Sequence, residues 1–146
     1  MGRSILAVIA GYLAMVFGLF LVFTAVYLLI GADGAFQKGS YQVSILWNLL
    51  TLVISLVAAL GGGYVCARIA RSMAAPKFLA GLVLVLGLLE AGWAATHPKP
   101  DPGGRAGDVP NLEAMKKAQT PTWVTAITAL IGAGGVMIGA RAKIKD

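Results

Sequence analysis

A single carboxylate, Glu90, stands in an otherwise apolar stretch of the sequence. Moving a charge into lipid is costly, so such a residue becomes neutral, finds a partner or faces water, and it marks a candidate site for a proton or a cation. Other apolar stretches carry polar residues that we expect at a similar depth. We therefore predict a polar pocket, open to the outer side, lined by Glu90, Asn48, Thr51, Thr125 and Thr128.

Glu90 also has a simpler interpretation. It lies about two turns before the end of its apolar stretch, where its side chain reaches hydrated headgroups or forms a structural hydrogen bond with Asn48 and the threonines. The apolar stretches contain no second carboxylate and no basic partner, which argues against coupled transport. Both interpretations remain open at the level of the sequence.

Signatures of catalysis and metal binding are missing from the sequence. Its one histidine, His97, and its one cysteine, Cys66, fall on opposite sides of the membrane, so they cannot assemble a zinc site. A single cysteine excludes an internal disulfide, and the glycine-rich stretches lack the lysine of a phosphate-binding loop. We expect a protein that is not an enzyme and that binds no cofactor and no metal.

The composition is typical of a membrane protein, since 58% of the 146 residues are hydrophobic and 12% are charged. About 20 apolar residues in a helix cross a hydrocarbon core roughly 30 Å thick. The apolar runs are continuous and not alternating, which indicates helices and not barrel strands. We predict an all-α fold, a four-transmembrane-helix bundle in a single membrane domain over residues 1–146, with helices at about 4–30, 43–70, 77–96 and 121–141 and outer loops at 31–42 and 97–120.

The first apolar run, 5–30, begins as a signal peptide does, and the small residues of "GADGA" at 31–35 resemble a cleavage site. The run is longer than the apolar core of about 7 to 15 residues that signal peptides have. We therefore expect a retained signal anchor.

Basic residues are distributed unevenly between the two sides of this predicted topology. One side has Arg3, Arg68, Arg71, Lys77, Arg141, Lys143 and Lys145 against Asp146, and the other has Lys38, Lys99, Arg105, Lys116 and Lys117 against Asp33, Asp101, Asp108 and Glu113. Lysine and arginine favour the cytoplasmic side, so the first side, with both termini, is predicted to be cytoplasmic. The net charge of +6 then follows mainly from topology, and no patch indicates a nucleic-acid partner.

Aromatic and basic residues mark the two predicted interfaces. Tryptophan and tyrosine favour the headgroup region of a bilayer. Alternating helix directions place at the outer interface Trp47, Trp93 and Trp123, with Tyr27 and Tyr41 beside them. At the inner interface the stretch "LGGGYVC" is followed by Arg68 and Arg71, which we expect to anchor the second helix in the headgroups.

Small residues recur at helical spacing and predict close helix packing, within the chain or between chains. On the first segment they follow alternating steps of three and four from Ser4 through Gly11 to Gly18. The glycines that we assign to helix contacts are Gly11, Gly18, Gly61, Gly62, Gly63, Gly132, Gly135 and Gly139. A kink, or backbone left accessible to a ligand, is the alternative role for the three consecutive glycines.

The longer outer loop contains a further predicted element. "PNLEAMKKA" reads as a short helix with Asn111 as a possible N-cap, lying on the membrane or covering the bundle. The loop over 97–121 is either a connector or a partner-binding surface.

Several motifs resemble a known group of proteins. "GADGAF" with "GSY" and Trp47, "GGGYVCARIAR", "PNLEAMKKAQTPTW" and "IGAGGVMIGAR" together cover nearly the whole chain. They are similar to small bacterial membrane proteins that have four transmembrane helices and no assigned activity. The resemblance implies four helices in a bacterial inner membrane, and it brings no functional residue with it.

From the sequence we expect a multi-pass protein of a bacterial inner membrane, a non-catalytic accessory or oligomeric component that acts through helix packing. Its expected partners are membrane lipids and either a second copy or another membrane protein. The alternative is a small channel or carrier for a proton, a cation or a small solute, which would use Glu90.

Overall fold

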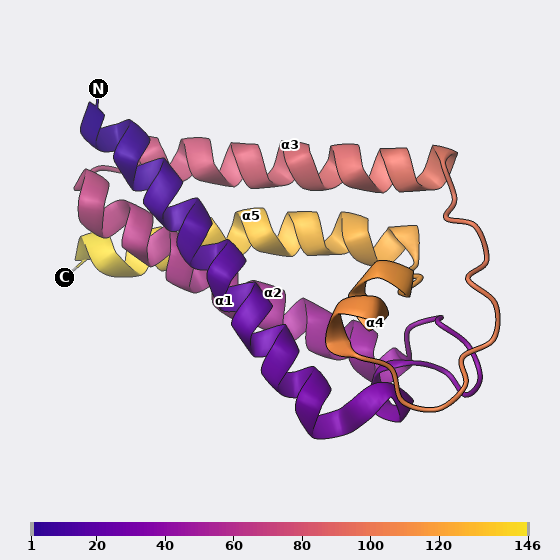
Figure 1. Ribbon diagram of the computed structural model, residues 1–146. Helices are drawn as coiled ribbons and strands as arrows, with labels where there is room; N and C mark the ends of the chain where they lie inside the picture. Colours follow the sequence, from indigo (N-terminus) through magenta and orange to yellow (C-terminus); the bar gives the residue numbers. More distant parts are fainter. Residues whose placement is uncertain (1, 146) are drawn as a thin grey trace.

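The computed structural model describes residues 2–145, which form five helices joined by turns and loops (Figure 1). The helices are α1 (Gly2–Ala35), α2 (Ile45–Ala70), α3 (Ala74–Thr96), α4 (Asn111–Lys117) and α5 (Thr122–Lys145). All except α4 are long and apolar enough to cross a membrane. The structure thus confirms the predicted all-helical fold and the predicted number of four helices that can cross a membrane.

The first helix runs past its predicted end at residue 30. Gly31 lies inside it with φ 68° and ψ −179°, a conformation that an L side chain rarely adopts, and a further helical turn follows as far as Ala35. The straight part of α1 therefore ends close to the predicted position, and the glycine redirects the chain toward the loop.

The bundle is built around a central pair of helices, α2 and α5, which run in the same direction (Figure 1). α1 packs on α2, and α3 packs on α5. Both chain termini lie at one end of the bundle, here called the terminal end, and the loops with α4 lie at the opposite end, the cap end.

Glycines bring the backbones of α2 and α5 into contact. A β carbon added at Gly63 would strike the backbone of Val136, and one added at Gly139 would strike the backbone of Leu60. At Gly135 it would lie 2.7 Å from the β carbon of Ala59. Helices in lipid associate through such close packing, so these glycines hold the central pair together.

The outer helices use glycine in the same way. A β carbon at Gly11 of α1 would lie 2.8 Å from the carbonyl oxygen of Gly62, and one at Gly87 of α3 would lie 2.5 Å from the β carbon of Ala129. Gly132 of α5 faces Val83 of α3.

Gly18 and Gly61, also predicted as packing residues, contact no helix within the described chain, since a β carbon at either position would have no neighbour within 4 Å. For Gly18 the reason is the direction of α1. Its inward face follows steps of four through Ala7, Gly11 and Met15 to Tyr27, not alternating steps of three and four. A row with that spacing winds around the helix, so α1 crosses the bundle obliquely and Gly18 is turned away.

Residues 36–44 and 97–121, which include α4, form a cap over the helix ends opposite the chain termini. Backbone bridges join Phe36 to Val43 and Gln42 to Gln119, so the two loops pair with each other. A second apolar core lies beneath them, formed by Tyr27, Ala32, Ala35, Phe36, Tyr41, Val43 and Ala114.

The cap changes the expected aromatic belt. Tyr27 and Tyr41 are buried in the cap core, each 5% exposed, and Tyr27 donates a hydrogen bond to the carbonyl of Val109 at 2.6 Å. Trp93 and Trp123 remain exposed on the helix surface. The two tyrosines therefore contact the protein and do not face outward, which the sequence did not indicate because it did not show that the loops fold over them.

The short helix α4 covers the bundle, with Ala114 buried against it and Leu112 exposed. Asn111 is not its N-cap, because Pro110 holds that position. The Asn111 amide instead donates to the Thr24 hydroxyl on α1 at 3.1 Å, which ties the start of α4 to a transmembrane helix.

Candidate functional site

A wedge-shaped groove separates α1 from α3. The two helices are close at the terminal end, where Gly11 meets Leu79, and they diverge toward the cap end (Figure 1). Since α1 crosses the bundle obliquely, the space between them widens steadily. α2 and α5 form its floor, and residues of the cap border its mouth.

The inner part of the groove is mainly apolar and has a volume of about 300 Å³. Its walls include Met15, Leu19 and Phe23 of α1, Val83 of α3 and Val124 of α5. Its polar residues are Thr51, Ser55 and Thr128, with Glu90, Thr120 and Thr125 toward the mouth.

Two of the groove threonines donate their hydroxyl hydrogens within their own helices. Thr51 Oγ1 donates to the carbonyl of Trp47 at 2.8 Å, and Thr128 Oγ1 donates to that of Val124 at 2.7 Å. Their oxygens can still accept a hydrogen bond. This part of the groove therefore suits an apolar chain better than a hydrated ion.

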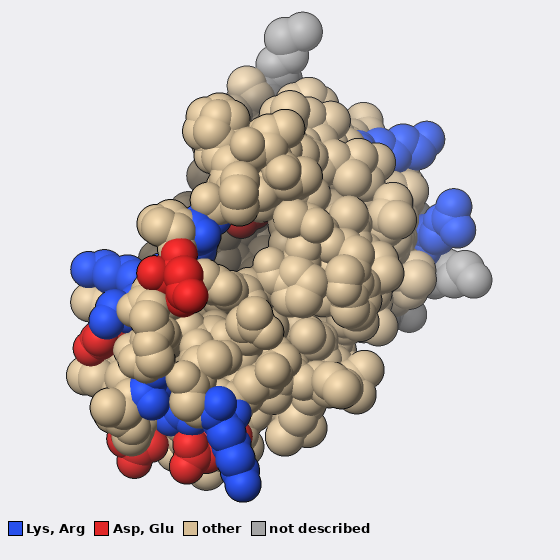
Figure 2. Space-filling view, turned by 90° about the vertical axis from the view of Figure 1, so that its right-hand side faces the viewer, with Lys and Arg blue, Asp and Glu red and all other residues tan. Residues whose placement is uncertain are grey.

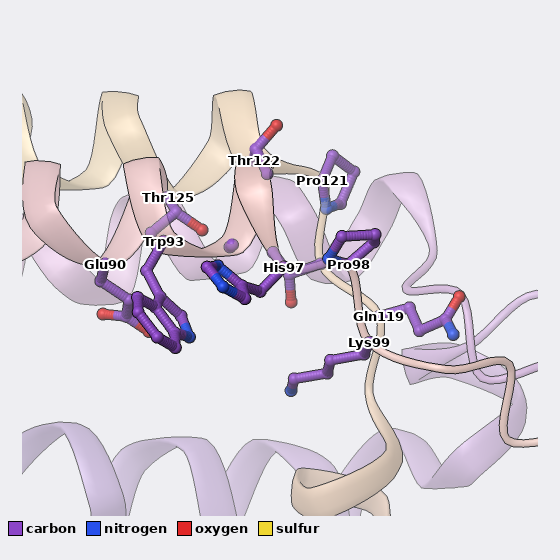
Figure 3. A pocket seen from close by; sticks show the side chains of 11 residues that line it. Glu90, Trp93, His97, Pro98, Lys99, Gln119, Pro121, Thr122 and Thr125 are labelled. Carbon is purple, nitrogen blue, oxygen red and sulfur yellow. The ribbon is translucent and has the colours of Figure 1, made fainter.

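The mouth of the groove has a volume of about 530 Å³ and a more polar lining. Figure 3 shows Glu90 and Trp93 projecting from α3 and His97 just after its end, with Lys99 extending from the following loop into the same space. Glu90, Thr120 and Thr125 line both the mouth and the inner part, so the two form one continuous groove. The cap-end view shows the hollow beside the charged surface of the cap (Figure 2).

Glu90 is exposed, and within residues 2–145 it forms no hydrogen bond and no ion pair. The structural hydrogen bond with Asn48 that the sequence allowed is not present. A carboxyl group in a transmembrane helix that has no protein partner becomes neutral or accepts hydrogen bonds from water or a ligand. The groove gives it access to both.

The neighbours of Glu90 are held in place. The Trp93 ring stacks on His97 with 3.9 Å between ring centroids, and the Thr96 hydroxyl lies 2.9 Å from His97 Nδ1. Lys99 Nζ donates to the carbonyl of Ala118 at 3.3 Å, which directs the ammonium along the mouth. The mouth thus presents the Glu90 carboxylate and the Lys99 ammonium, together with the stacked rings of Trp93 and His97.

The structure brings together four of the five residues predicted for a polar pocket: Glu90, Thr51, Thr125 and Thr128. Asn48 lies outside the lining, and its Oδ1 is buried without a hydrogen-bond partner. The physical reason is the course of α1, which crosses the start of α2 where Phe23 and Tyr27 pack on Trp47.

Sequence reasoning missed the groove residues contributed by other elements. Lys99 and Gln119 come from the cap, and Met15 and Phe23 come from the inward face of α1. The spacing of four residues along α1 could have predicted its inward face from the sequence. Nothing in the sequence indicated that Lys99 lies at the same groove as Glu90.

In the described part of the chain, no group of three or more His, Cys, Asp and Glu side chains gathers in a way that could hold a metal ion. Comparisons with protein-family models, curated proteins and solved structures found no match. The function must therefore be argued from the groove itself.

Proposed function

We propose that this chain is a non-catalytic accessory protein of a bacterial inner membrane that binds an amphipathic molecule with a zwitterionic head. The observation that carries the proposal is the unpaired Glu90 carboxylate at the polar mouth of an apolar groove. The apolar chain would lie against Met15, Leu19 and Phe23. An ammonium group would meet Glu90 and the face of the Trp93 ring that is not stacked on His97, and an oxyanion would meet Lys99.

Binding is favoured over a through-passage by the packing at the terminal end. There the backbones of Gly11 and Gly62 are in contact and Leu79 is fully buried against them. The groove widens only toward the cap end, which supports a site that is open to lipid and to the outer side. A proton or cation channel based on Glu90 has no such supporting feature.

The proposed orientation has both termini in the cytoplasm. Its support is the excess of lysine and arginine at the terminal end, together with the tryptophans Trp93 and Trp123 near the cap end. The groove mouth then faces the outer leaflet, where the heads of lipids are available as ligands.

Lysolipids brominated on the chain carbons next to the head provide a direct test, because bromine quenches tryptophan fluorescence on contact and Trp93 lines the mouth. With Trp47 and Trp123 replaced by Phe, a phosphoethanolamine head should bind more tightly than a phosphoglycerol head on the same chain. Glu90→Gln should weaken the first about tenfold, which corresponds to one charge-assisted hydrogen bond, and leave the second unchanged.

Glu113→Gln is the matched control, since Glu113 pairs with Lys117 on α4 and lies outside the groove. It should bind both lysolipids as the parent protein does. Equal affinity of the parent and Glu90→Gln for the phosphoethanolamine head would remove Glu90 from the site. Non-saturable quenching would overturn the binding function altogether.

A second candidate, assembly with another membrane protein or with a second copy, rests on Gly18 and Gly61. Both are open to a neighbouring helix, and small residues permit close approach in lipid. Native mass spectrometry after gentle extraction would test it. A defined complex that is lost in Gly18→Leu or Gly61→Leu would support assembly, whereas a monomer would leave these glycines without a partner.

A further inference from the structure

Three basic side chains surround one hollow at the terminal end of the bundle. The hollow has a volume of about 540 Å³ and is lined by Arg68 and Arg71 from the end of α2, Lys143 from the end of α5, and Ala67. Among the residues that the structure describes, no acidic residue takes part in the lining. We infer that this hollow binds the phosphate of an anionic phospholipid headgroup.

Placement distinguishes these three residues from Lys77, Arg141 and Arg3 at the same end. Lys77 and Arg141 lie outside the hollow. Arg3 is engaged with the protein, because its Nε donates to the carbonyl of Ile69 at 2.7 Å. A general preference of arginine and lysine for one side of the membrane does not require that three of them share one concave site.

The packing of the central pair creates this arrangement. α2 and α5 run in the same direction with their backbones in contact at Gly63 and Gly139, so their basic ends emerge side by side. Arg68 and Arg71 are three residues apart. Two guanidinium forks and one ammonium then flank the same space, and such a donor set matches phosphate oxygens.

The backbone of Arg71 adopts an unusual conformation at the end of α2. Its φ of 54° and ψ of 29° lie in the left-handed region, where glycine is the usual residue at a helix end. Its N–H donates to the carbonyl of Ala67 at 2.8 Å and closes α2. The chain thus carries an arginine where the backbone favours glycine, and that arginine lines the hollow.

A lipid headgroup is a better occupant than free phosphate because of where the hollow lies. It adjoins the ends of two membrane-spanning helices, and Ala67, 1% exposed, gives it an apolar floor. Basic pockets between transmembrane helices are suited to anionic lipid heads. The inference does not depend on the groove at the cap end, with which the hollow shares no residue.

The test compares two variants of the full chain that lose the same charge at the same end. One is Arg68→Gln with Lys143→Gln, in the hollow. The other is Lys77→Gln with Arg141→Gln, outside it. Each is placed in nanodiscs of phosphatidylcholine with phosphatidylglycerol as the minor component, and native mass spectrometry measures the phosphatidylglycerol that remains bound.

We expect the hollow variant to lose about tenfold in retained phosphatidylglycerol and the control variant to stay within about twofold of the parent. Equal losses in the two variants would show general surface attraction and would overturn the inference. Glycerol phosphate added to nanodiscs of phosphatidylcholine alone provides the second arm. Saturable binding of it at the hollow, with no retention of the lipid, would assign the site to a soluble anion.

Thermal unfolding of both variants in phosphatidylcholine alone separates a lost site from a lost fold. If the hollow variant unfolds at a lower temperature than the control, Arg68→Lys is used in its place, because it keeps the charge and removes the planar fork. Its expected retention lies between those of the parent and the hollow variant. If Arg68→Lys and the double variant Arg68→Gln with Lys143→Gln both retain as much phosphatidylglycerol as the parent, the site is ruled out.

Discussion

At the scale of single residues, Arg105 fixes the cap onto the transmembrane helices. Its guanidinium donates to Asp33 at 2.6 Å and to the carbonyl of Gly107 at 2.7 Å, and its N–H donates to the carbonyl of Gly39 at 3.0 Å. Its side chain is 2% exposed, whereas that of Asp33 is 84% exposed. The arginine therefore depends on these contacts, and the aspartate remains solvated.

We predict that Arg105→Ala frees the cap while leaving the bundle intact. Each hydrogen bond to a charged group is worth about 1.5–3 kcal/mol, and two are lost. Hydrogen exchange should become faster over 97–119 and stay unchanged in α2 and α5. Asp33→Asn should have a smaller effect, because its side-chain oxygen still accepts the bond. Unchanged exchange in Arg105→Ala would show that the apolar cap core is sufficient.

Lys117 offers a prediction about pH in the same region. Its hydrogen bond to Glu113 raises the pKa of the ammonium above the ordinary 10.5, and the charge of Glu113 and the Tyr41 hydroxyl add to the rise, against a smaller lowering by desolvation. The stabilising effect of the pair is therefore complete below pH 10.5 and is lost as the pH rises through the raised value. In Glu113→Gln the pKa of Lys117 should fall toward 10.5, as measured by NMR titration of Nζ.

At the scale of helices, glycine contacts decide the spacing of the central pair. Consecutive glycines on α2 provide a matched comparison, since Gly63 faces the backbone of Val136 and Gly61 faces open space. In Gly63→Ala the added β carbon must push α5 away, whereas in Gly61→Ala it meets nothing.

We predict a lower midpoint of thermal unfolding for Gly63→Ala in mild detergent. Gly61→Ala should be neutral or slightly stabilising, because alanine favours a helix over glycine by about 1 kcal/mol in water. The same midpoint for both variants would contradict the close approach of α2 and α5. Since these contacts are made within one chain, the expected failure is loss of the fold before any loss of assembly.

The helix boundaries and the groove differ in how far the sequence could predict them. The spans followed from local hydropathy, and Thr51, Thr125 and Thr128 could be placed at a common depth by counting turns. Asn48 could not be excluded in that way, because its burial depends on the angle at which α1 crosses α2. Lys99 could not be included, because loop 97–110 is positioned by Arg105 and the cap core.

At the scale of the whole molecule, the orientation in the membrane is the central prediction. Cys66 is buried, so a variant with Cys66→Ala provides a background without reactive thiols. In that background Asp101→Cys in the cap should react with an impermeant maleimide on intact cells. Ser72→Cys, between α2 and α3 at the terminal end, should react only after permeabilisation. The reverse pattern would place the groove mouth in the cytoplasm.

The sequence by itself determined the four membrane spans, the division of the chain between helices and loops, and the isolation of Glu90 in an apolar helix. These depend on the hydropathy of short windows, which each segment carries without its neighbours. Only the tertiary structure decided which glycines meet, how far α1 diverges from α3, and that Arg68, Arg71 and Lys143 share one hollow. Those features depend on which helix faces pack together, and in lipid that choice is made by shape complementarity between helices and not by hydropathy.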